Sequence, residues 1–173
     1  MALRGGGALL GLARFFVLLF AMRAAETVLG LLPARASSFL DLFVLYAAFG
    51  AFKREVVGGA FFGLGVGLFR DLTSLQALGT DAFPCAAVGA FAAWSHRKLV
   101  GESTPGLFLI LGGAVLVHDL VAFAGLVRWD AGLFLTRVAL ATLPAALVTA
   151  LVGTAGREFR RGGRRRRRAE NLA

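Results

Sequence analysis

Five polar side chains stand inside stretches of sequence that are otherwise apolar, and their chemistry needs an explanation. Arg70 and Asp71 end a glycine-rich run, His118 and Asp119 lie within ILGGAVLVHDLVAF, and Arg137 lies within GLFLTRVALATLP. One imidazole and two carboxylates could relay a proton. However, the sequence contains no HExxH motif, paired-cysteine motif, Walker loop or Ser/His/Asp arrangement that would support a reaction centre. We therefore predict that the protein is not an enzyme, with no catalytic residue, no metal site and no cofactor.

The composition predicts that these side chains lie in a membrane. Of 173 residues, 58% are hydrophobic and 17% are charged, which is far from the usual composition of soluble proteins. Apolar blocks of about 20 residues can cross a bilayer as helices, whereas the alternation that a transmembrane barrel needs is absent. The expected fold is all-α, a polytopic membrane bundle with six transmembrane helices at residues 15–32, 39–52, 56–74, 77–94, 105–127 and 131–154. The second segment is short for a full crossing and the first carries Arg23 and Glu26, so the ends of these two helices are the least defined.

The distribution of Lys and Arg predicts the orientation of the bundle, because positive charge collects in short cytoplasmic loops. With the N-terminus inside, the three outer connections hold only Arg35 and Arg128. The inner segments hold many more basic residues, namely Arg4, Lys53, Arg54, Arg97, Lys98, Arg157, Arg160, Arg161 and the arginines that follow. Both termini are therefore expected in the cytoplasm.

A ridge of small residues is expected along the third helix. Four residues are spaced by four and share one face of a helix: Gly59, Gly63, Gly67 and Asp71. The fourth segment carries a matching ridge of Asp81, Cys85, Gly89 and Ala93. Because small residues let helix backbones approach closely in a membrane, we predict helix packing through Gly59, Gly63, Gly67 and Gly89.

The polar side chains are expected to form an intramembrane cluster of Asp71, His118, Asp119 and Arg137. Asp119 and Arg137 fall at similar depths in antiparallel neighbours, where an ion pair avoids the cost of an isolated charge. Asp71 is the competing acid, and its role as a helix cap or as part of a functional polar cluster stays open. Arg70 points about 100° away around the same helix and is expected to extend towards lipid headgroups. As a hypothesis, Arg70 and Asp71 bind a partner protein.

The C-terminal segment differs from the rest of the chain. We predict one transmembrane domain over residues 1–155 and a basic, disordered cytoplasmic tail over residues 156–173. Basic residues next to a span are attracted to anionic lipid headgroups. This membrane-surface role, rather than nucleic-acid binding, is assigned to Arg164, Arg165, Arg166, Arg167 and Arg168.

The order of these features over residues 39–154 resembles the MreD family, a membrane component of the bacterial rod-shape machinery, or elongasome. In FLDLFVLYAAFGAFKREVVGGAFFGLGVGLFRDLTSLQALGTDAF, a short span ends in a basic turn, a glycine-rich span follows, and the residues D-L-x-S and L-G precede the next span. The basic loop SHRKLVGES, the acidic Asp119 and Pro144 in the last span also fit. The resemblance implies a non-enzymatic scaffold of the inner membrane that maintains cell shape during peptidoglycan synthesis.

The same resemblance implies the partners and one rival function. The partners would be an MreC-like protein and, in the wider complex, the MreB cytoskeleton and the peptidoglycan polymerase and transpeptidase, with homo-oligomerisation left open. The architecture is also similar to the substrate-binding S components of energy-coupling transporters, so the alternative is a membrane subunit that binds a vitamin-type small molecule. The short outer loops count against that alternative, and the missing motifs count against a small membrane enzyme.

Overall fold

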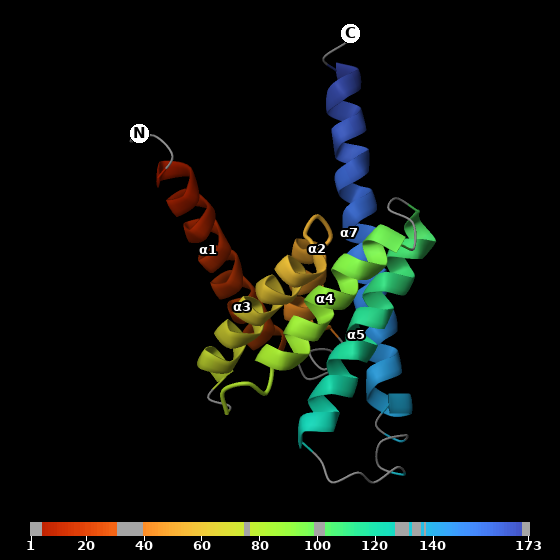
Figure 1. Cartoon of the computed structure of the whole chain (residues 1–173). Coiled ribbons are helices and arrows are strands. Elements are labelled where there is room, and N and C mark those ends of the chain that lie inside the picture. Colours follow the sequence, from red (N-terminus) through yellow and green to blue (C-terminus); the bar gives the residue numbers. More distant parts are fainter. Residues whose placement is uncertain are drawn as a thin grey trace.

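The computed structural model describes residues 5–30, 40–74, 77–98, 103–126, 132, 136 and 138–170, with side chains described over 10–28, 40–74, 77–98, 103–124, 132, 136 and 138–159. All regular structure in these ranges is helical, which confirms the all-α prediction. The elements are α1 (Gly5–Gly30), α2 (Leu42–Ala51), α3 (Val56–Ser74), α4 (Ala82–Lys98), α5 (Thr104–Leu126), the π-helical turn η2 (Val138–Thr142) and α7 (Leu143–Glu170) (Figure 1).

The short helix α2 forms the centre of the bundle. It packs against α3, α4 and α5 and also touches α1 and α7. Asp41 caps its start, where the carboxylate accepts a hydrogen bond of 3.0 Å from the backbone N–H of Val44. At about 1.5 Å per residue, its 10 residues span about half of the hydrocarbon thickness. Neighbouring helices therefore shield α2, and its buried residues are Phe43, Val44, Ala47, Ala48 and Ala51.

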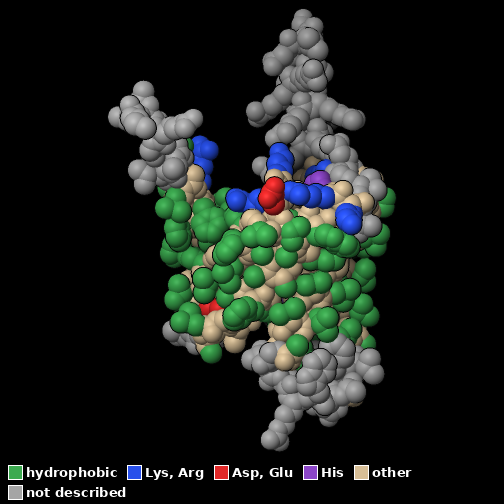
Figure 2. Space-filling view, viewed as in Figure 1, with side chains coloured by type: hydrophobic (Ala, Val, Ile, Leu, Met, Phe, Trp, Pro, Cys, Tyr) green, Lys and Arg blue, Asp and Glu red, His purple; other side chains and the backbone are tan. Residues whose placement is uncertain are grey.

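Three described helical segments are long and apolar enough to cross a membrane: Val56–Ser74, Thr104–Ala124 and Val138–Phe159. They correspond to the third, fifth and sixth predicted spans. The helices α2 and α4, with 10 and 17 residues, are shorter than the about 20 residues of a full crossing. Hydrophobic side chains cover the middle of the face in Figure 2, while Lys and Arg gather at its upper end. An apolar surface of this extent suits contact with lipid rather than with water.

The last helix continues further than the sequence predicts. α7 extends to Glu170, so most of the segment that was expected to be a disordered tail is helical. Arginine has a high helix propensity, and a helix that is already formed adds residues more easily than a new one forms. As a result, α7 protrudes beyond the bundle at its upper end, the same end at which α1 begins (Figure 1).

The π-helical turn before α7 follows from a proline. Pro144 has no N–H, so the carbonyl of Leu140, four residues earlier in η2, cannot receive the usual helical hydrogen bond from it. A widened turn accommodates such an interruption. Thr142, at the end of this turn, is buried.

Candidate functional site

The closest helix–helix packing in the structure aligns the elements that carry the polar side chains. α3 and α4 share the most extensive contact among the described elements. A Cβ atom at Gly63 would collide with the carbonyl oxygen of Cys85, so no larger residue fits there without a shift of backbone. The four glycines predicted as packing positions are all buried at this contact: Gly59, Gly63, Gly67 and Gly89. The two helices are therefore antiparallel neighbours with their backbones close together.

Asp71, at the end of α3, caps the beginning of α4. Its carboxylate accepts hydrogen bonds from the backbone N–H groups of Gly79 at 2.7 Å, Asp81 at 2.9 Å and Ala82 at 3.2 Å. The hydroxyl of Thr80 donates a fourth bond at 3.1 Å. A carboxylate at this position also interacts favourably with the positive end of the helix dipole. The side chain is only 1% exposed, so the structure places Asp71 as an internal cap and does not support its predicted role in binding a partner.

The local sequence of the α3–α4 turn suits this cap. Gly79 adopts a φ of 102°, a left-handed backbone conformation that residues other than glycine rarely adopt. Pro84, which has no N–H, lies in the first turn of α4, where a missing donor does no harm. The N–H of Cys85 already bonds to the carbonyl of Asp81 at 3.0 Å. The exposed amides of the helix start are thus either bonded or absent.

Arg70 joins two acids from different elements, which corrects the prediction that it extends to lipid headgroups. Its Nη1 donates to Oδ2 of Asp41 at 2.8 Å, and its Nε lies 3.2 Å from Oδ2 of Asp81. The guanidinium also lies over the ring of Phe43, 5.5 Å from its centroid. A planar guanidinium can serve two carboxylates at once. In a low-dielectric interior an unpaired guanidinium or carboxylate is costly, and the pairing of Arg70 with the two acids avoids that cost.

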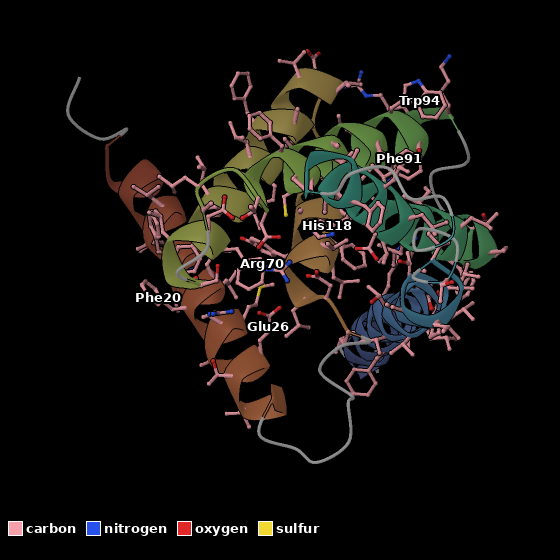
Figure 3. All side chains as sticks on the ribbon, turned by 90° about the horizontal axis from the view of Figure 1, so that it is seen from below. Phe20, Glu26, Arg70, Phe91, Trp94 and His118 are labelled. Carbon is pink, nitrogen blue, oxygen red and sulfur yellow. The ribbon has the colours of Figure 1, made fainter. Side chains whose placement is uncertain are left out.

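His118 and Asp119 lie in the same region of the bundle. Nδ1 of His118 is 3.1 Å from Oδ1 of Asp119, and Nε2 is 3.8 Å from Oδ1 of Asp81. The other oxygen of Asp119 accepts a hydrogen bond of 2.6 Å from the hydroxyl of Thr142 in η2. Arg137, the predicted partner of Asp119, lies outside the described residues, so that pairing stays a prediction. Figure 3 shows His118 and Arg70 both directed towards the middle of the bundle.

These contacts form one polar network, which ties α3, α5 and η2 to the starts of α2 and α4. The members of this polar network are Asp41, Arg70, Asp71, Asp81, His118, Asp119 and Thr142. Within the described part of the chain, no three His, Cys, Asp or Glu side chains are arranged to hold a metal ion. The contacts shown pair acids with an arginine, backbone amides, a hydroxyl and an imidazole. Such an arrangement holds helices in register.

The first helix, α1, contacts the end of α3 next to this network. Arg23 lies 3.4 Å from Glu26, three residues later in α1, and donates to the carbonyl of Thr73 at 3.3 Å. The latter bond links α1 to the end of α3, and it adds to the packing of the buried Leu19 and of Phe15 and Phe20 against α2 and α3. For the five membrane-surface arginines, the structure describes the backbone as part of α7 and not the side chains, so their predicted contact with headgroups stays a prediction: Arg164, Arg165, Arg166, Arg167 and Arg168.

Three members of the network were not predicted from the sequence as polar sites. Asp41 precedes an apolar run, which is a typical N-cap signal and could have identified it. Asp81 was assigned only to the packing ridge, although its carboxylate faces Arg70. Thr142 follows an apolar stretch and precedes Pro144 by two residues, and no local pattern indicates that its hydroxyl faces an acid.

The fold and the polar network together indicate the class of protein. The described chain is a helical bundle that contains three helices able to span a membrane, with a half-buried polar network that links its elements. These features are consistent with a membrane protein. Comparisons with protein-family models, with curated proteins and with solved structures find no match to this chain.

Proposed function

We propose that this protein is a non-enzymatic scaffold of the bacterial cell-wall elongation machinery, acting in the inner membrane through an MreC-like partner. The proposal rests on the observation that the polar side chains are engaged in contacts within the bundle. Asp71 accepts four hydrogen bonds from the α3–α4 turn, and Arg70 is held between Asp41 and Asp81. Groups engaged in this way fix the shape of the bundle, as a scaffold requires. The resemblance in the sequence supplies the identity of the partners.

We further propose that the bundle crosses the membrane six times, with both termini in the cytoplasm. In support, α1 begins and α7 ends on one side of the bundle (Figure 1). Lys53 and Arg54 are exposed in the connection between α2 and α3, and Arg97 and Lys98 are exposed at the end of α4. In Figure 2, Lys and Arg side chains gather at the upper end of the bundle, the end at which α1 begins in Figure 1. The short α2 counts as a crossing because five other helices contact it and none of its side chains is exposed.

The accessible part of the network suggests where a partner could reach it. The side chain of Arg70 is 21% exposed and that of Asp119 is 38% exposed, whereas Asp71 is buried. Of the two residues predicted to bind a partner, Arg70 therefore remains a candidate through its exposed edge. A partner that contacts the bundle at the polar network would meet the partly exposed side chains of Arg70 and Asp119 rather than the buried carboxylate of Asp71.

The test is to identify what the protein binds in its own membrane. An affinity-tagged chain, expressed at native level and crosslinked before solubilisation, should recover an MreC-like protein and peptidoglycan synthesis enzymes. Depletion of the chain should abolish the rod shape of the cell. Recovery of a pair of ATPases, with normal cell shape on depletion, would favour the transporter alternative and contradict the scaffold.

A further inference from the structure

His118 has an unusual environment, because both ring nitrogens face carboxylate oxygens. Nδ1 lies 3.1 Å from Oδ1 of Asp119, and Nε2 lies 3.8 Å from Oδ1 of Asp81. The side chain is 8% exposed. Its Nε2 atom is buried without a hydrogen-bond partner. The two acids come from different elements, since Asp119 is on α5 and Asp81 lies in the turn before α4.

Neither neutral form of the imidazole suits this geometry. A neutral ring carries a proton on one nitrogen and a lone pair on the other. With the proton on Nδ1, the lone pair of Nε2 faces the carboxylate of Asp81. With the proton on Nε2, the lone pair of Nδ1 faces the carboxylate of Asp119 at hydrogen-bond distance. In each case an acceptor opposes an acceptor in a site that is largely removed from water, which is unfavourable.

The charges around the ring favour a cation at this position. The charged groups that face it are Asp119 on α5, Asp81 before α4 and, further away, Asp41 before α2. From α3, Arg70 contacts Asp41 and Asp81 and offsets one of these three acids. With a neutral ring, the three acids and Arg70 carry two excess negative charges. A positive charge on His118 reduces this excess to one. Fewer uncompensated charges are favourable in a medium of low dielectric constant.

We propose that His118 is a proton-binding site whose imidazolium form bridges Asp119 and Asp81 and so couples α5 to the α3–α4 turn. The bound proton belongs to the structure of the bundle and takes part in no reaction. The inference rests on the geometry of the ring and is independent of the proposed scaffold function.

The protonation state can be read directly, because the chain contains only two histidines. In a His96→Gln background, ¹⁵N-histidine labelling leaves His118 as the sole imidazole signal. The labelled protein is placed in lipid nanodiscs at pH 7, and the ¹⁵N spectrum distinguishes a protonated ring nitrogen from a bare one. We expect both nitrogens of His118 to be protonated. A spectrum with one bare nitrogen would overturn the proposal.

A second variant tests the assigned cause. In Asp81→Asn, the carboxamide can present its NH₂ group to Nε2, so the lone pair of a neutral ring gains a donor. We expect loss of the proton from Nε2 at pH 7 in this variant, while Glu55→Gln, at an exposed carboxylate, should leave the spectrum unchanged. If the ring of Asp81→Asn stays doubly protonated, Asp81 is not what holds the proton and the bridge is refuted. The spectrum of the protein with native Asp81 is interpretable even if the variant folds poorly.

Discussion

The carboxylate of Asp71, at the end of α3, accepts a hydrogen bond of 2.9 Å from the backbone amide of Asp81, just before α4 begins. This contact makes the end of one helix the cap of the next. It also explains why an acid can be tolerated among apolar residues, since its lone pairs are used within the chain. The capped turn in turn holds the carboxylate of Asp81 against Arg70.

We predict that Asp71→Asn destabilises the bundle. The variant loses the negative charge and offers an NH₂ group to amides that need an acceptor, which should lower the free energy of unfolding by about 2–4 kcal/mol. Thermal unfolding of the purified protein in detergent measures the effect. Glu55→Gln, which neutralises an exposed carboxylate, is the control and should leave the melting temperature unchanged. Equal melting temperatures for both variants would show that the cap contributes nothing to stability.

Two glycines on α3 should respond differently to the same change. A Cβ atom at Gly63 collides with the backbone of Cys85, whereas a Cβ atom at Gly65 meets nothing within 4 Å. Gly63→Ala should therefore separate α3 from α4 and lower the amount of folded protein in the membrane. Gly65→Ala should be neutral or stabilise by up to about 1 kcal/mol, because alanine favours the helix. Fluorescence-detected gel filtration of the two variants measures the difference, and equal tolerance would contradict the observed packing.

Removal of Arg70 should leave two acids without their shared partner. Arg70→Gln is expected to cost about 3–5 kcal/mol, as for a broken buried ion pair. Because Arg70 contacts Asp81, Arg70→Gln combined with Asp81→Asn should cost less than the sum of the single changes, by about 1–3 kcal/mol. Arg70→Gln combined with Asp119→Asn is the comparison, because the structure shows no direct contact between Arg70 and Asp119, and it should be closer to additive. Additivity in both pairs would rule out the Arg70–Asp81 interaction.

The hydrogen bond between Thr142 and Asp119 can be removed with little change of shape. Thr142→Val deletes the hydroxyl that donates to Oδ2 of Asp119 at 2.6 Å. The expected loss is about 1.5–3 kcal/mol, because the acceptor is charged. Thr136→Val is a suitable control, since Thr136 is exposed and its hydroxyl donates to the carbonyl of Gly132, four residues earlier. An unfolding transition of Thr142→Val that matches the control would argue against a stabilising role for this bond.

The proposed orientation predicts the location of reporter fusions. Fusions after Arg54, after Lys98 and at the C-terminus should report the cytoplasm, because these positions follow the basic segments of the chain. Fusions after Arg35 and after Arg128 should report the outside. The readout is paired alkaline phosphatase and fluorescent-protein activity in intact cells. A C-terminal fusion located outside would exclude an even number of crossings with the N-terminus inside.

Local patterns in the sequence determined the helical character of the chain and much of its packing. The predicted third span, residues 56–74, matches α3 (Val56–Ser74), because a long apolar run between a basic turn and polar residues leaves little freedom in where the helix begins and ends. The four-residue spacing of the glycines also indicated which face of α3 meets α4, since a ridge without side chains is the face that another backbone can approach.

The partners of the charged residues were decided only by the tertiary structure. Arg70 pairs with Asp41, 29 residues earlier, and with Asp81, 11 residues later, although Asp71 is its neighbour in sequence. Hydropathy is a sum over local residues and is therefore readable from the chain. An ion pair depends on the depth and rotation of two separate elements, and several acids lie near the same depth. Only the packed bundle selects among them, and that selection makes Asp71 a cap and Arg70 a bridge.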